Sequence, residues 1–178
     1  IGRQEIFIKK NEKEWFVSQR ENKESDPQLI YGEERNAGND LQWQVIIGEK
    51  SNTLIPVPTL PDRTVVVKIS HPFKVMPGKS AQLYIPIPIW IQYYATSRKA
   101  ENLFFESPAQ ALSSTWVGES DGGTLAYSLN VDFFNSLQPP AETSHHIICP
   151  IKITNDSPGV LDIQRLLLEV EYLSVYAD

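Results

Sequence analysis

Cysteine is almost absent from this sequence, because Cys149 is the one thiol in 178 residues. A single cysteine forms no disulfide within the chain, so a small secreted scaffold held by disulfides is excluded. Long apolar runs are missing too, and no stretch approaches the roughly 18 residues of a membrane-spanning helix. Without a basic-then-apolar leader either, we expect a cytoplasmic protein with no membrane span, and the sequence leaves open whether a leader is removed before Ile1.

Basic residues are scarce in the C-terminal part of the chain. Residues 1–99 carry 14 Lys/Arg and 11 Asp/Glu, whereas residues 100–178 carry two Lys/Arg and 11 Asp/Glu. The net charge of the whole chain is −6. Affinity for nucleic acid comes mainly from cations that displace counterions from phosphates, so DNA and RNA are not expected as partners.

Proline, in contrast, outnumbers glycine by 13 to 9, and seven of the prolines lie within residues 56–88. Because proline lacks an N–H donor and breaks the interior of a helix, no long helix is expected there. The runs of Val, Ile and Tyr between these prolines are typical of short antiparallel strands. Pro86 and Pro88 are two residues apart, which indicates an edge strand, a bulge or a crossing between sheets.

Alternating apolar residues predict strands along most of the chain. Residues 4–9 and 15–18 are expected to pair as a hairpin around a tight turn. The polar residues 20–40 predict a loop, and the PVPTLP segment at 56–61 predicts a stiff connector between strands. Further strands are predicted at 41–48, 53–57, 64–70, 103–105, 110–112 and 124–129.

Two apolar runs near the C-terminus, 144–154 and 160–176, flank a turn at 155–159. The turn has the sequence Asn-Asp-Ser-Pro-Gly, so the two runs are predicted to form a hairpin. The second run also fits helical spacing. A strand is favoured because alternate residues form an apolar face opposite Arg165, Glu169 and Glu171, and the helix remains open as the alternative. The apolar set is Leu166, Leu168, Val170 and Tyr172.

These patterns predict an all-β protein, an antiparallel β-sandwich that is immunoglobulin-like or related. We expect a single domain over residues 1–178. Within it, residues 1–55 are predicted to form an N-terminal β-hairpin extension and residues 56–178 the sandwich core.

One motif imitates a catalytic site, because residues 118–122 match G-x-S-x-G. In esterases this motif holds a nucleophilic serine on a strained turn between a strand and a helix, and a histidine follows later in the chain, as His145 or His146 does here. The short, proline-broken strands do not fit the parallel sheet and crossover helices of that fold. A polar hairpin turn between 114–117 and 124–128 is therefore favoured, with a small serine hydrolase using Ser120 as the alternative.

Metal binding has little support in the sequence. On an extended strand, His145 and Cys149 would share a face but lie about 13 Å apart, at about 3.3 Å per residue. Zinc ligands lie about 2.0–2.3 Å from the ion, so these two side chains cannot share one. We expect neither a metal nor a cofactor.

The run Thr115-Trp116-Val117-Gly118-Glu119, continued by Gly122-Gly123 and Leu125-Ala126-Tyr127, resembles a sequence block of an uncharacterised archaeal family, the domain-of-unknown-function family 432. Residues 86–89, 149–155 and 161–176 also resemble this family, and the resemblance spans roughly residues 56–176. It implies a mostly β cytoplasmic protein. No activity is established for the family, so no catalytic residue follows from the resemblance.

We therefore expect a non-enzymatic binding or assembly module that contacts a protein partner or a second copy through an edge strand or an aromatic patch. The candidate ligand-binding residues are Trp116, Glu119, Asp121 and Tyr127, and no catalytic residue is expected. A carbohydrate-binding β-sandwich is a further alternative, which requires two exposed tryptophans on one face. The sequence identifies neither a small ligand nor the oligomeric state.

Overall fold

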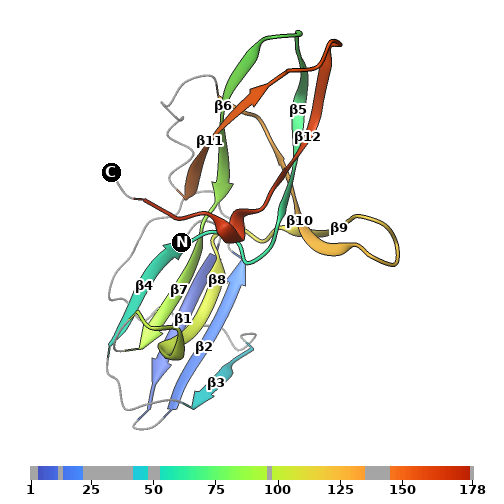
Figure 1. Ribbon diagram of the computed structural model, residues 1–178. Helices are drawn as coiled ribbons and strands as arrows, with labels where there is room; N and C mark the ends of the chain where they lie inside the picture. Colours follow the sequence, from blue (N-terminus) through green and yellow to red (C-terminus); the bar gives the residue numbers. More distant parts are fainter. Residues whose placement is uncertain are drawn as a thin grey trace. The chain divides into compact units, whose positions relative to one another are not determined.

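The computed structural model describes residues 4–11, 14–21, 42–47, 53–95, 98–134 and 145–176. Within these ranges the regular structure consists of strands and two short 3-10 helices, without an α-helix (Figure 1). The expected all-β sandwich class is confirmed. No helix in the described ranges has the length and apolar character to cross a membrane.

Contacts group the chain into two compact units, of which the first comprises 1–59 and 90–110 and the second 60–89 and 111–178. The expected single domain, with an extension over 1–55 and a sandwich over 56–178, stays a prediction. The grouping differs from it, because residues 90–110 join the N-terminal residues. Each unit is described separately below.

The first unit contains two three-stranded antiparallel sheets. One has the order β1 (Gln4–Lys10), β2 (Glu14–Glu21), β3 (Gln44–Ile47), and the other has the order β4 (Leu54–Thr59), β7 (Trp90–Ala95), β8 (Leu103–Pro108). A 3-10 helix, η1 (Ala100–Asn102), precedes β8. Pairing of β1 with β2 confirms the N-terminal hairpin. The predicted loop at 20–40 falls almost wholly outside the described residues.

Side chains connect the two sheets of this unit. The ring of Trp15 in β2 meets the ring of Phe104 in β8 edge-on, with 5.4 Å between centroids. The buried Ser107 hydroxyl donates to Gln19 Oε1 at 3.0 Å. The sheets of the first unit therefore pack face to face.

Two predictions fail near this unit. Residues 56–59 are not a connector but part of β4, which pairs with β7 and with no other strand in the described part of the chain. Such an edge strand tolerates Pro56 and Pro58, because no second described strand needs their N–H groups. The strand predicted at 110–112 is wrong as well. The chain bends after β8 at Ala109, which is buried, and the next strand begins at Ser113.

The second unit holds a four-stranded sheet and a two-stranded sheet. The first has the order β12 (Leu161–Leu168), β5 (Val65–Val75), β10 (Thr124–Val131), β9 (Ser113–Val117), and the second pairs β11 (His146–Thr154) with β6 (Ser80–Pro88). All pairs are antiparallel except β5 with β10, which run parallel. This parallel pair departs from the expected antiparallel sheets.

The core of the second unit lies between its two sheets. Val65 and Val67 of β5 are fully buried, as are Ile85 and Ile87 of β6. They belong to one cluster that also takes in the inward residues of the other strands. Removing this apolar surface from water is the main force that holds the two sheets together.

β6 is an edge strand in the described structure, as one of the interpretations of its prolines predicted. β11 pairs along one side of it. On the other side, Tyr84 exchanges two main-chain hydrogen bonds of 3.0 Å with Phe134. Pro86 and Pro88 lie two and four residues after Tyr84, so their main-chain groups point to this same second side. Because proline has no N–H group, a strand added there would lack two hydrogen-bond donors.

The turn at 155–159 is correctly placed, but the hairpin predicted around it is wrong. Its flanking strands belong to different sheets, because β11 pairs with β6 and β12 pairs with β5. The buried side chain of Asn155 explains the arrangement. The side-chain Nδ2 donates to the carbonyl oxygens of Val75 and Gly159, both at 2.8 Å. The main-chain N–H of Asn155 donates to the carbonyl oxygen of Lys79 at 2.9 Å. The turn is thereby bonded to the link between β5 and β6, which also passes from one sheet to the other.

The strand favoured for 160–176 is correct as far as Leu168, and a 3-10 helix, η3 (Val170–Tyr172), follows it. The register between β12 and β5 shifts between Ile163 and Arg165. In β12 the inward-facing residues therefore have odd numbers before the shift and even numbers after it. The step across the shift is three residues, which resembles the spacing of a helix. Tyr172 was expected on the inner face and is instead 80% exposed, because the strand has already ended.

Candidate functional site

The candidate residues lie on the β9–β10 hairpin, which extends beyond the rest of its sheet (Figure 1). Its strands pair from Val117 opposite Thr124 to Ser113 opposite Ser128. β10 pairs with β5 only from Tyr127 onward. The distal half of the hairpin therefore has no support from β5.

A Gly-rich loop closes this hairpin, and the indole of Trp116 lies against it. Trp116 Nε1 donates to the carbonyl oxygen of Glu119 at 2.9 Å, and the N–H of Gly123 donates to the same oxygen at 2.8 Å. A Cβ on Gly123 would lie 2.3 Å from Trp116 Nε1 and 2.5 Å from the carbonyl oxygen of Val117. Glycine is required at position 123 because the indole and the backbone occupy the space of any side chain.

Gly118 has a φ of +102°, a backbone angle that residues other than glycine rarely adopt. The two glycines at either end of the loop are thus explained by backbone conformation and close packing. Neither requires a catalytic role for the serine between them.

Ser120 lies in this loop between two antiparallel strands, as the favoured hairpin prediction stated. A nucleophile elbow joins a strand to a helix, and here the loop leads into β10 instead. The strand-to-helix context that the hydrolase alternative requires is therefore missing at Ser120.

One face of the hairpin is apolar and exposed. Trp116 is directly opposite Leu125, so their side chains share a face, and they are 53% and 45% exposed. Leu125 continues the inward-facing row of β10, in which Leu129 is buried. The apolar row of the core thus runs out of the sandwich onto the hairpin.

Tyr127 lies at the base of the hairpin, between Leu125 and Leu129 on the same face of β10, and its ring packs against the core. Its hydroxyl donates to Asp62 Oδ1 at 2.8 Å, and the Arg63 guanidinium lies 5.6 Å from the centre of its ring. Arg63 Nε also approaches Asp62 Oδ2 at 3.3 Å. These contacts connect β10 to the residues that lead into β5, so they stabilise the fold.

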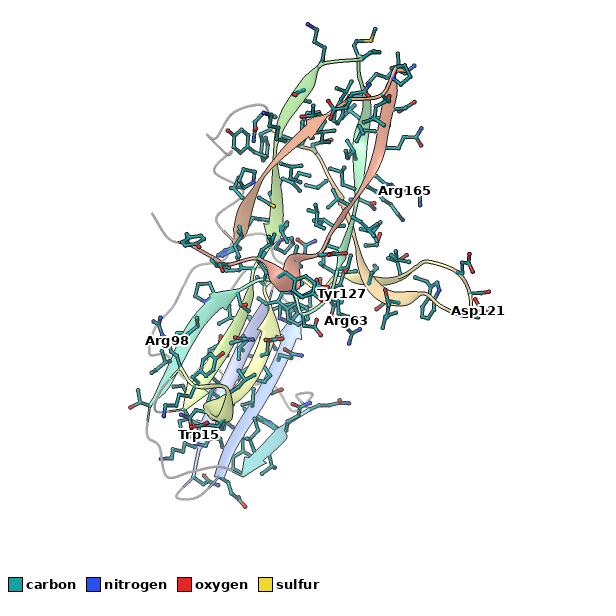
Figure 2. The ribbon with its side chains drawn as sticks, in the orientation of Figure 1. Trp15, Arg63, Arg98, Asp121, Tyr127 and Arg165 are labelled. Carbon is teal, nitrogen blue, oxygen red and sulfur yellow. The ribbon has the colours of Figure 1, made fainter. Side chains whose placement is uncertain are left out.

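The four predicted ligand-binding residues therefore do not form one site. Trp116 and Glu119 touch each other, Asp121 lies at the exposed end of the hairpin, and Tyr127 is at its base beside Arg63 (Figure 2). Their role as ligand-binding residues stays a prediction.

The open side of β9 was not predicted. The N–H of Tyr127 bonds to the carbonyl oxygen of Thr64 at 2.9 Å, on the β5 side, so Tyr127 and its cross-strand partner Ser114 form a non-hydrogen-bonded pair. Since such pairs alternate with hydrogen-bonded ones, the main-chain groups of Ser114 and Trp116 both point away from β10. β9 has β10 as its one strand neighbour in the described part of the chain.

Of the four tryptophans, all of which are described, Trp116 is the exposed one. Trp15 is buried, whereas Trp43 and Trp90 are half-buried. The two exposed tryptophans required for a sugar-binding platform are not found.

The residues considered for metal binding do not converge. Among the residues that the structure describes, no three His, Cys, Asp or Glu side chains form a group that could hold a metal ion. His146 begins β11, and Cys149 lies half-buried further along this strand. Burial raises the pKa of the Cys149 thiol, as expected for a structural cysteine rather than a metal ligand.

A family described as "Protein of unknown function (DUF432)" matches residues 1–178. The match extends the resemblance seen at 56–176 to the whole chain, including the N-terminal hairpin. No curated protein and no solved structure matches the chain.

Proposed function

Since the chain belongs to the DUF432 family, for which no activity is stated, we propose from its own residues that it is a non-enzymatic binding and assembly module. Its contact surface is the β9–β10 hairpin, and its partner is a protein. The immunoglobulin-like topology, the archaeal origin and the cytoplasmic location stay predictions.

The observation that carries this proposal is the exposed apolar face of the hairpin beside an open strand edge. Trp116 and Leu125 present large apolar side chains, and Ser114 and Trp116 direct main-chain donors and acceptors outward. An exposed tryptophan near an apolar side chain is a common anchor of protein interfaces. An open edge supplies the main-chain hydrogen bonds of strand addition.

A protein partner fits this surface better than a nucleic acid or a sugar. The hairpin loop carries Glu119 and Asp121, and the C-terminal part of the chain is strongly acidic, so phosphates would be repelled. A sugar platform has less support, because Trp116 is the single exposed tryptophan.

Catalysis by Ser120 has less support than binding. The glycines around it are explained by the packing of Trp116 and by the φ of Gly118. The proposal therefore treats the loop as the closure of a presented hairpin.

A photo-crosslinking amino acid at Leu125 tests the proposal. The matched control is the same amino acid at Val160, which lies between β11 and β12 and is 51% exposed, close to the 45% of Leu125. We expect covalent protein adducts from position 125 and few from position 160, in the purified protein or in an extract of the source cells. Equal yields at the two positions, or no adduct at 125 in either sample, would overturn the proposal.

A further inference from the structure

The two outer strands of the four-stranded sheet differ in how they are protected. β12 carries the exposed charges Asp162 and Arg165, and its pairing with β5 is irregular between Ile163 and Arg165. Charges and irregular pairing are devices by which sheet edges avoid adding further strands. β9 (Ser113–Val117) contains no charged residue and no proline.

The open edge of β9 is short and well defined. Of its five residues, Ser114 and Trp116 direct their N–H and C=O groups away from β10, as the bond from Tyr127 to Thr64 establishes. Ser113, Thr115 and Val117 direct theirs toward β10. The edge therefore offers two donors and two acceptors.

We propose that this edge pairs with the same edge of a second copy of the chain, antiparallel and about a two-fold axis that passes beside Thr115. In this register Ser114 of each copy faces Trp116 of the other as a hydrogen-bonded pair. All four outward groups of each copy are then used, giving four hydrogen bonds. Thr115 lies opposite Thr115 of the second copy in a non-hydrogen-bonded pair.

A second copy is favoured over an unrelated strand because β9 complements itself. An isologous pairing requires one patch to match its own copy, and here the large Trp116 side chain meets the small Ser114. No like charges come to lie opposite each other within the paired strands, since the strand carries none. At its end, Glu119 would lie opposite the uncharged Ala111.

The apolar faces of the two hairpins also join in this arrangement. Trp116, Leu125 and Ser114 share one face of the hairpin, so the same face of the second copy continues it across the new pair. Two indoles and two leucine side chains that are exposed in the single chain would then line one surface. Burying them supplies the apolar contribution that main-chain bonds alone lack.

This inference rests on the proposed function and names its partner. Its first test is the variant Thr115→Cys, because Cβ atoms in a non-hydrogen-bonded pair are about 4.5–5.5 Å apart, close to the about 3.5–4.5 Å of a disulfide. The matched control is Ser113→Cys, on the same face of β9. Ser113 would face Val117 of the second copy, and two copies of Ser113 would lie about 13 Å apart at about 3.3 Å per residue.

Under mild oxidation, Thr115→Cys should give a disulfide-linked dimer, whereas Ser113→Cys and the parent chain should remain unlinked. Mixing Ser113→Cys with Val117→Cys should link the two different chains. Links between two Ser113→Cys chains, or none from Thr115→Cys, would overturn the proposed pairing.

A second variant, Ser114→Pro, tests the pairing without cross-linking. Its lost N–H points outward, so the fold of the single chain should be kept, which thermal unfolding checks. Sedimentation velocity should show the parent chain as a dimer at high concentration and Ser114→Pro as a monomer. A parent chain that is monomeric at every concentration overturns the inference, whereas adducts of Leu125 with another protein would leave the proposed function standing.

Discussion

The indole of Trp116 donates to the carbonyl oxygen of Glu119 at 2.9 Å, across the loop that contains Ser120. The same oxygen accepts the N–H of Gly123, whose α-carbon leaves room for the indole. A sequence that matches a catalytic motif is thus explained by the packing of one tryptophan on one glycine. Half of that tryptophan remains exposed, and it is this exposed part that we assign to binding.

Gly123→Ala should destabilise the hairpin. The new Cβ would lie within 2.7 Å of three atoms, two of which are backbone carbonyl oxygens. Overpacking of this kind costs about 1–3 kcal/mol. Gly122→Ala is the control, because no atom lies within 4 Å of its Cβ position. Urea unfolding of the two variants should differ accordingly, and equal stability would contradict the described packing.

Asn155→Ala should lower the free energy of unfolding by about 2–3 kcal/mol, because buried groups lose their hydrogen-bond partners. Besides its two bonds through Nδ2, Asn155 Oδ1 accepts the N–H of Ser157 at 3.0 Å and its hydroxyl at 2.7 Å. Asp156→Ala, at an exposed neighbouring position, should have little effect. If urea unfolding gives the same midpoint for both variants, the turn does not hold the two sheets as described.

The thiol of Cys149 should react slowly with iodoacetamide in the folded protein. Burial raises its pKa, so the thiolate forms at higher pH than in the unfolded chain, where the pKa is about 8.5. The folded state disfavours the thiolate. The protonated thiol of Cys149 therefore contributes to the stability of the fold below the pKa of the unfolded chain, and this contribution is lost as the pH rises through the pKa of the folded protein. Alkylation rates with and without urea that follow the same pH profile would contradict this.

Short p-nitrophenyl esters should not be turned over by the protein. Ser120 lies in a hairpin loop, and the elbow geometry of a serine hydrolase is missing around it. Release of p-nitrophenol should therefore be the same for the parent chain and for Ser120→Ala. Turnover by the parent chain that Ser120→Ala abolishes would establish the hydrolase instead.

Local patterns in the sequence predicted most strands and the β9–β10 hairpin, because alternation and turn residues act over short distances. They failed where the partner of a strand decides the outcome. The turn at 155–159 is plain in the sequence, yet its composition does not say whether the flanking strands pair with each other or enter different sheets. Likewise, the register shift near Ile163 arises from β5 and imitates helical spacing.

The candidate site shows the same division. Trp116 and Glu119 were predicted together and do touch, since they are three residues apart in one hairpin. Tyr127 was grouped with them, but its hydroxyl bonds to Asp62, its ring lies beside Arg63, and the ring also packs against the core, so its contacts are with residues far away in the sequence. The open edge at Ser114 could not be predicted, because it depends on which side of β10 pairs with β5.

Amide exchange along β9, measured residue by residue by NMR at several protein concentrations, tests the central claim most directly. The amides of Ser113, Thr115 and Val117 point toward β10 and should be protected at every concentration. Those of Ser114 and Trp116 point outward, so they should exchange freely in dilute solution and become protected as the concentration rises and the second copy binds. Free exchange of these two amides at all concentrations would contradict the pairing.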